Sequence, residues 1–157
     1  MNIAQLKKLG DLIAHQNDFA RANVASTLAN NDSDFAQEKA CRASEAFEKA
    51  NADEAAAVRD LHRAVFQQTE AFEEVEYYAD QAAQDSAINT KKALEAANKA
   101  DAEVLRARAK VKEMTHRAIE AKNLKKLCFE EAEITLSAAR QKAMMAFDKI
   151  QLWSALP

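Results

Sequence analysis

VEYYADQAAQDSAINTKK, residues 75–92, lies near the middle of the 157-residue chain and decides its fold. Residues 75–84 continue an acidic, helical pattern. Ser86, Asn89 and Thr90 are residue types that favour turns and helix caps. Residues 91–92 are both lysine and open a basic segment. We interpret residues 85–90 as a turn between two helices, with Thr90 capping the second one.

The chain has almost none of the residues that interrupt helices. Gly10 is its one glycine and Pro157 its one proline, so residues 11–156 contain neither. Alanine, the strongest helix former, occupies 36 positions. A sheet protein needs many turns, and turns rely on glycine and proline. The composition therefore predicts an all-α fold, and the length fits one domain.

Small and apolar residues recur every seven positions on both sides of the predicted turn, which is typical of a coiled coil. Lys125 interrupts one row, and we interpret Leu124 and Leu127 as replacing it at a local stutter. The pattern predicts a long antiparallel two-helix coiled-coil hairpin. The rows before the turn are Phe47, Glu54, Leu61, Gln68, Val75, Ala82 and Ala43, Ala50, Val58, Val65, Phe72, Ala79. Those after it are Ala97, Val104, Val111, Ala118, Ala132, Ala139, Ala146, Trp153 and Ala100, Ala107, Met114, Ala121, Cys128.

A second interruption is predicted at residues 30–34, which read NNDSD. Such side chains compete for backbone hydrogen bonds, and Asp34 with Gln37 matches a capping box. We expect a kink here, or an extra short helix that folds back on the hairpin. The chain is then a single elongated coiled-coil domain, residues 1–157, with helices at about 2–29, 35–85 and 91–156.

Large apolar residues are concentrated near both chain ends, which a hairpin brings to one pole. One interpretation is a core at that pole. The apolar residues also occupy adjacent positions, so one partner helix cannot cover them all. We therefore expect Phe147, Ile150 and Trp153 to include contacts to another protein.

Charge is distributed unevenly, with a net −9 over residues 30–88 and +5 over residues 89–157. Two interpretations stay open for the basic stretch 104–126: a solvated face that pairs with Asp53, Glu54 and Asp60, or a docking surface for an acidic protein. Nucleic acid is disfavoured because the pI is about 5.7 and no aromatic residues lie among the bases. The bases are Arg106, Arg108, Lys110, Lys112, Arg117, Lys122, Lys125 and Lys126.

Three aromatic residues precede the predicted turn. We expect Phe72 in the seam between the helices. Tyr77 and Tyr78 are adjacent and so about 100° apart on a helix, which turns at least one away from the seam. They are candidate partner contacts, with edge packing as the alternative.

No motif in the chain indicates catalysis. Glu113 and His116 form one Glu-x-x-His, but the second copy that di-iron bundles use is absent. Cys41 and Cys128 lack metal-ligand spacing and are expected to be small buried hydrophobes. We predict a non-enzymatic protein without cofactor or metal. No apolar run is long enough to span a bilayer and the start does not resemble a signal peptide, so we expect a cytoplasmic protein without membrane insertion.

Three short pieces carry a family resemblance. Residues 3–9 (IAQLKKL) open a helix with Leu-x-x-Leu, residues 121–127 (AKNLKKL) form a basic, leucine-marked stretch, and residues 141–149 end the second helix with polar residues. With the predicted hairpin, these resemble the central-stalk proteins of bacterial type III secretion and flagellar export ATPases.

The resemblance implies a function and partners. The paired chain ends, residues 3–19 and 134–156, would enter the hexameric secretion ATPase. The tyrosine pair would face the export-gate protein, and the basic stretch would meet acidic surface on either. Such stalks also escort export chaperones, and they are cytoplasmic, peripheral to the inner membrane through the secretion complex. The alternative is a structural or scaffold coiled coil that self-associates into a helical bundle.

Overall fold

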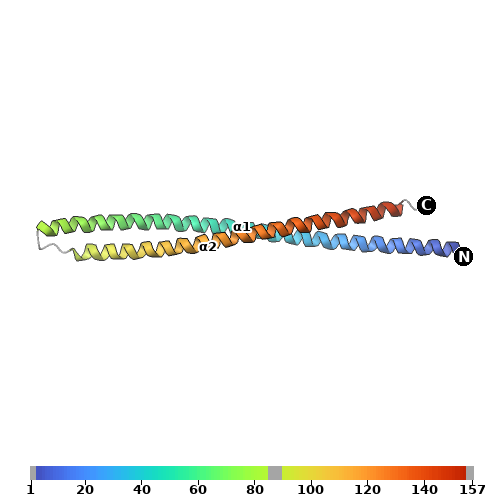
Figure 1. Ribbon diagram of the computed structural model, residues 1–157, viewed down its shortest axis with the longest axis horizontal. Helices are drawn as coiled ribbons and strands as arrows, with labels where there is room; N and C mark the ends of the chain where they lie inside the picture. Colours follow the sequence, from blue (N-terminus) through green and yellow to red (C-terminus); the bar gives the residue numbers. More distant parts are fainter. Residues whose placement is uncertain (1–2, 85–89, 155–157) are drawn as a thin grey trace. The chain divides into compact units, whose positions relative to one another are not determined.

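Two long α-helices make up the fold (Figure 1). The computed structural model describes residues 3–84 and 90–154, and for residues 4, 84 and 152–154 the backbone alone. Helix α1 spans Ile3–Gln84 and helix α2 spans Lys91–Ser154, and the two pack against each other. The described residues contain no strand, and the predicted all-α hairpin is confirmed.

Helix α2 begins where the sequence predicted. The Thr90 carbonyl accepts a hydrogen bond from the Leu94 backbone N–H at 3.1 Å, as the residue that precedes a helix does. Residues 85–89 of the predicted turn lie outside the described residues.

The break predicted at residues 30–34 is wrong, because α1 continues through it. Ser33, in the middle of this stretch, is 3% exposed, so it lies in the helix–helix seam. Its hydroxyl accepts a hydrogen bond from Gln37 Nε2 at 3.3 Å, one helical turn further on. Burial of this face outweighs the local preference of Asn, Asp and Ser for turns, because helix stability in proteins comes mainly from packing.

The seam follows an unbroken seven-residue repeat in both helices. With the repeat positions labelled a to g, residues at a and d are buried or half-buried over residues 26–75 of α1 and 93–139 of α2, whereas the next d positions, Tyr78 and Lys142, are exposed. Helix α1 contributes Ser26, Ser33, Ala40, Phe47, Glu54, Leu61, Gln68, Val75 and Ala82 at a, and Ala29, Ala36, Ala43, Ala50, Ala57, Ala64 and Ala71 at d. Helix α2 contributes Ala97, Val104, Val111, Ala118, Lys125, Ala132, Ala139 and Ala146 at a, and Ala93, Ala100, Ala107, Met114, Ala121, Cys128 and Thr135 at d.

Alanine displaces larger residues from the seam of α1. The d positions here are Ala57, Ala64 and Ala71. The residues predicted for the seam, Val58, Val65 and Phe72, each lie one position further along, at e. Phe72, expected in the core, is 44% exposed. Small d residues let the two helices approach closely, which leaves no room for larger side chains between them.

The predicted stutter at Lys125 is also wrong. Lys125 is half-buried at its a position, whereas Leu124 and Leu127 are exposed. The Lys125 ammonium lies 5.8 Å from the centre of the Phe129 ring. The aliphatic part of a lysine can fill a seam position while its charged end reaches the surface.

The chain divides into two compact units. Unit 1 comprises Met1–Ser44 and Leu124–Pro157, and unit 2 comprises Glu45–Asn123. Within each unit the helices are antiparallel, because contacts pair rising residue numbers in α1 with falling ones in α2. In unit 1 these contacts are Asp18–Lys149 and Lys39–Glu131. In unit 2 they are Glu54–Thr115, Asp60–Lys110 and Gln68–Asp101.

The two flanks of the seam have different chemistry. The g positions carry ion pairs between the helices, Lys39–Glu131 in unit 1 and Asp60–Lys110 in unit 2. The e positions of α2 instead supply Asp101 and Thr115, which hydrogen-bond to a positions of α1. Neither helix has, among its described residues, a stretch apolar and long enough to cross a membrane.

Candidate protein-interaction surfaces

Unit 1 has a thin core and an apolar exterior. Its buried cluster consists of Ala36, Ala40, Ala43, Cys128 and Ala132. The large apolar residues near the chain ends lie outside this core, so they do not form the alternative core at the pole. Those exposed are Ile3, Leu6, Leu9, Leu12, Ile13, Val24, Leu28, Phe35, Leu124, Leu127, Phe129, Ile134, Met144, Met145, Phe147 and Ile150. The candidate contacts Phe147 and Ile150 belong to this surface, and the side chain of Trp153 lies outside the described residues.

A groove of about 370 Å³ opens on the e flank of unit 1. Phe129 and Leu136, seven residues apart at e positions of α2, form its apolar wall. Its other lining residues are Gln37, Ala40, Cys41, Ala132 and Glu133. The two cysteines differ, since Cys128 is buried as predicted whereas Cys41 is exposed and borders this groove; both thiols are free.

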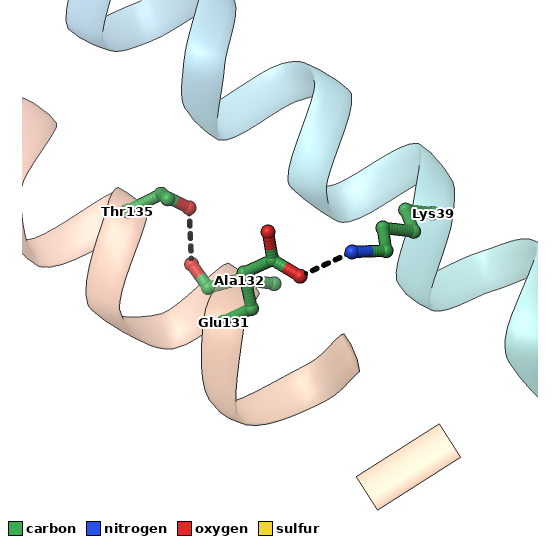
Figure 2. A network of polar contacts seen from close by, with 4 residues as sticks. All are labelled: Lys39, Glu131, Ala132 and Thr135. Atoms are coloured by element: carbon green, nitrogen blue, oxygen red, sulfur yellow. Dashed lines mark hydrogen bonds and ion pairs between the residues drawn. The ribbon is translucent and has the colours of Figure 1, made fainter. Parts of the chain in front are cut away.

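On the opposite flank of unit 1, charge links the two helices. The Lys39 ammonium donates to Glu131 Oε2 at 2.6 Å, and in Figure 2 the two side chains point toward each other from α1 and α2. This hydrogen bond, with the charge of Glu131, raises the pKa of Lys39 above its ordinary 10.5. One turn along α2, the Thr135 hydroxyl donates to the Ala132 carbonyl at 3.0 Å (Figure 2).

The eight bases of residues 104–126 fall into distinct environments. Lys110 donates to Asp60 Oδ2 at 3.0 Å, which with the positive charge of Lys110 lowers the pKa of Asp60 below its ordinary 3.8. Arg117 pairs with Glu113 at 2.6 Å and Lys126 with Glu130 at 3.8 Å, each within α2. Lys125 lies in the seam. Arg106, Arg108, Lys112 and Lys122 are exposed.

The acids proposed to pair with these bases do so only in part. Asp60 does, whereas Glu54 accepts a hydrogen bond from the Thr115 hydroxyl at 2.7 Å. Among the described residues, four of the eight bases form no ion pair: Arg106, Arg108, Lys112 and Lys122.

The tyrosine pair lies on the outside of unit 2. Tyr77 is 60% and Tyr78 37% exposed. Their rings are in edge-to-face contact, with centroids 5.5 Å apart and planes at 74°. Ring–ring contact of this kind holds the two aromatic side chains together on the surface.

The Glu-x-x-His pair does not form a joint site. Glu113 accepts from Arg117, and His116 Nε2 lies 3.2 Å from Glu120 Oε1, so each is directed to its own i+4 neighbour. Within residues 3–84 and 90–154, no three or more His, Cys, Asp or Glu side chains gather where they could hold a metal ion.

Sequence reasoning missed the contacts that connect the two helices at seam a positions. Gln68 Nε2 donates to Asp101 Oδ1, and Glu54 accepts from Thr115. The signal was available in the sequence. Glu54 and Gln68 are polar residues at a positions, two heptads apart, and polar groups in a seam need polar partners on the facing helix.

Comparison with protein-family models, curated proteins and solved structures finds no match. The chain is thus placed by its fold alone, as an all-α helical hairpin.

Proposed function

We propose that this protein is a non-enzymatic helical hairpin that binds other proteins, with unit 1 as its main binding surface. The observation that carries the proposal is the apolar exterior of unit 1 around a core of small residues. Exposed apolar patches of this extent mark interaction sites in soluble proteins. Phe129, Phe147 and Ile150 offer the large anchors on which such binding depends.

The specific form of the proposal is the central stalk of a type III secretion ATPase, linking it to the export gate and assisting protein secretion. It rests on the resemblance of residues 3–9 and 121–127 to that family. Residues 3–9 and 124–127 of these segments belong to unit 1, whereas residues 121–123 belong to unit 2. In this role the hexameric ATPase covers unit 1, and the protein acts in the cytoplasm, at the inner membrane through the secretion complex.

The test is direct binding to the secretion ATPase encoded in the same genome, measured by biolayer interferometry and by ATP hydrolysis. Replacing Phe147 and Ile150 by serine removes two exposed apolar anchors and should weaken binding by at least about tenfold. The matched control is Ile119→Ser, an equally exposed apolar residue of unit 2, which should change binding less than about twofold. Normal ATPase binding by the double variant, or none by the unaltered chain, contradicts the stalk function.

Self-association into a helical bundle is the second candidate. The exposed Leu127 and Ile134 favour it, because they repeat at seven residues along α2, as a further helix of a bundle would require. Sedimentation velocity over a range of concentrations separates the candidates. A stalk stays monomeric, whereas a scaffold forms dimers or larger species that Ile134→Ser weakens.

A further inference from the structure

The e flank of unit 2 combines an apolar row with unpaired positive charge. Val58, Val65 and Phe72 repeat at seven residues along α1. Val58 is half-buried, and Val65 and Phe72 are exposed. The cations come from α2, where Arg108 and Lys122 occupy e positions and Lys112 lies one turn from Arg108. We call these six residues the basic–apolar face.

The register between the helices explains why Arg108 has no acceptor. Thr115 bonds to Glu54 and Asp101 bonds to Gln68. Arg108 lies midway between Thr115 and Asp101, so its counterpart in α1 is Leu61, midway between Glu54 and Gln68. Leu61 has no oxygen to accept from a guanidinium, whereas the two neighbouring e positions each find a polar partner.

The opposite flank of unit 2 lacks this imbalance. There Asp60 accepts from Lys110 and also lies 3.7 Å from Arg63, so both of these cations have a carboxylate partner. On the basic–apolar face, by contrast, Arg108, Lys112 and Lys122 form no ion pair with any described residue. The nearby carboxylates of Glu54 and Asp101 are already engaged in hydrogen bonds to Thr115 and Gln68.

We propose that this face binds an acidic amphipathic helix of another protein. Val58 and Phe72 are 14 residues apart, or about 21 Å along a helix, so four turns of a partner cover the apolar row. A partner helix laid there packs its apolar stripe on the α1 row and turns one polar edge to α2. Glutamates on that edge meet Arg108 and Lys112, which satisfies charges that this chain leaves unpaired.

The surface uses residues of unit 2 only, so it is independent of the function proposed for unit 1. It also singles out three of the eight bases of residues 104–126. The other five differ in their surroundings: Lys110, Arg117 and Lys126 are paired, Lys125 lies in the seam, and Arg106 occupies a c position away from the e flank.

Fluorescence anisotropy with two labelled peptides tests the proposal on the full chain. Both are designed amphipathic helices of about 18 residues with the same leucine stripe, flanked by glutamates in one and lysines in the other. We expect the acidic peptide to bind at least about tenfold more tightly, and added salt to reduce the difference. The double variant Arg108→Glu with Lys112→Glu should reverse the preference, and Val65→Ser should weaken both peptides.

The matched control is Lys99→Glu with Arg106→Glu, which makes the same charge change at two exposed c positions. It should alter acidic-peptide affinity less than about threefold, because those charges lie off the face. Circular dichroism checks that each variant keeps its helicity. Equal binding of both peptides, binding of neither, or an equal effect of the control overturns the proposal. So does a dimer in sedimentation that the Arg108 and Lys112 variant abolishes, since the occupant is then a second copy of the chain.

Discussion

Ala57 offers the sharpest test of close packing in the seam. It is the most deeply buried residue described, at 0% exposure, and occupies a d position of α1. Ala57→Leu adds three carbon atoms where the facing helix leaves no space. Overpacking of this kind destabilises by about 1–3 kcal/mol. At about 2–4 °C per kcal/mol for a chain of this length, a 2 kcal/mol loss lowers the melting temperature by about 4–8 °C.

The assay is thermal unfolding followed by circular dichroism, with hydrogen exchange to localise the change. Ala55→Leu is the matched control, because Ala55 is exposed two residues away and leucine is nearly as good a helix former as alanine. Its melting temperature should stay within about 1 °C of the unaltered chain. An unchanged or raised melting temperature for Ala57→Leu refutes the reasoning, since it shows that the seam has room for a large residue at d.

Three further predictions concern single side chains. The pKa of the Asp60 carboxyl, measured by NMR titration, should lie below 3.8, and Lys110→Ala should return it toward that value. Because the pKa is lowered in the folded chain, the pair stabilises the fold above pH 3.8, and this contribution disappears as the pH falls through the lowered pKa. Ser33→Ala should raise the melting temperature by about 1 °C, because alanine is the better helix former; a drop would mean that the Ser33 hydroxyl is needed in the seam. Replacing Tyr77 and Tyr78 by alanine should preserve helicity and weaken one binding event, and loss of helicity would identify them as packing residues.

The sequence was sufficient for the parts of the fold that depend on backbone preferences. The absence of glycine and proline from residues 11–156 predicted an all-α fold, and Thr90 marked the start of the helix after the turn. It was not sufficient at residues 30–34, because a window of turn-favouring residues does not reveal that Ser33 faces a partner helix. Burial of that one side chain, a long-range contact, decides the outcome.

The choice between neighbouring rows could not be made from apolarity alone. Phe72 is more apolar than Ala71, so a rule that places the larger residue inside selects the wrong row. Alanine occupies the seam because the distance between the helices is short, and that distance is a property of the pair. Lys125 was also misplaced by a rule based on polarity, because its charge suggested an interruption of the repeat. Its aliphatic stem fills the a position while its ammonium lies 5.8 Å from the centre of the Phe129 ring, so the repeat continues.

The sequence showed which residue types the candidate surfaces contain, but it did not show which of those residues are paired with the facing helix. The basic stretch and the apolar chain ends were visible as runs of residues. Which bases keep their charge unpaired depends on the register, which places Lys110 opposite Asp60 and Arg108 opposite Leu61. That information exists only once both helices are aligned.

The unbroken repeat limits how this chain can change in length. Inserting or deleting residues in one helix rotates every later side chain by about 100° per residue, so only changes of seven restore the seam. Even seven residues added to α1 alone shift Glu54 and Gln68 away from Thr115 and Asp101. Homologues of different length are therefore expected to differ by matched heptads in both helices, an equal number on each side of residues 85–89. Engineered versions, shortened or extended, should follow the same rule.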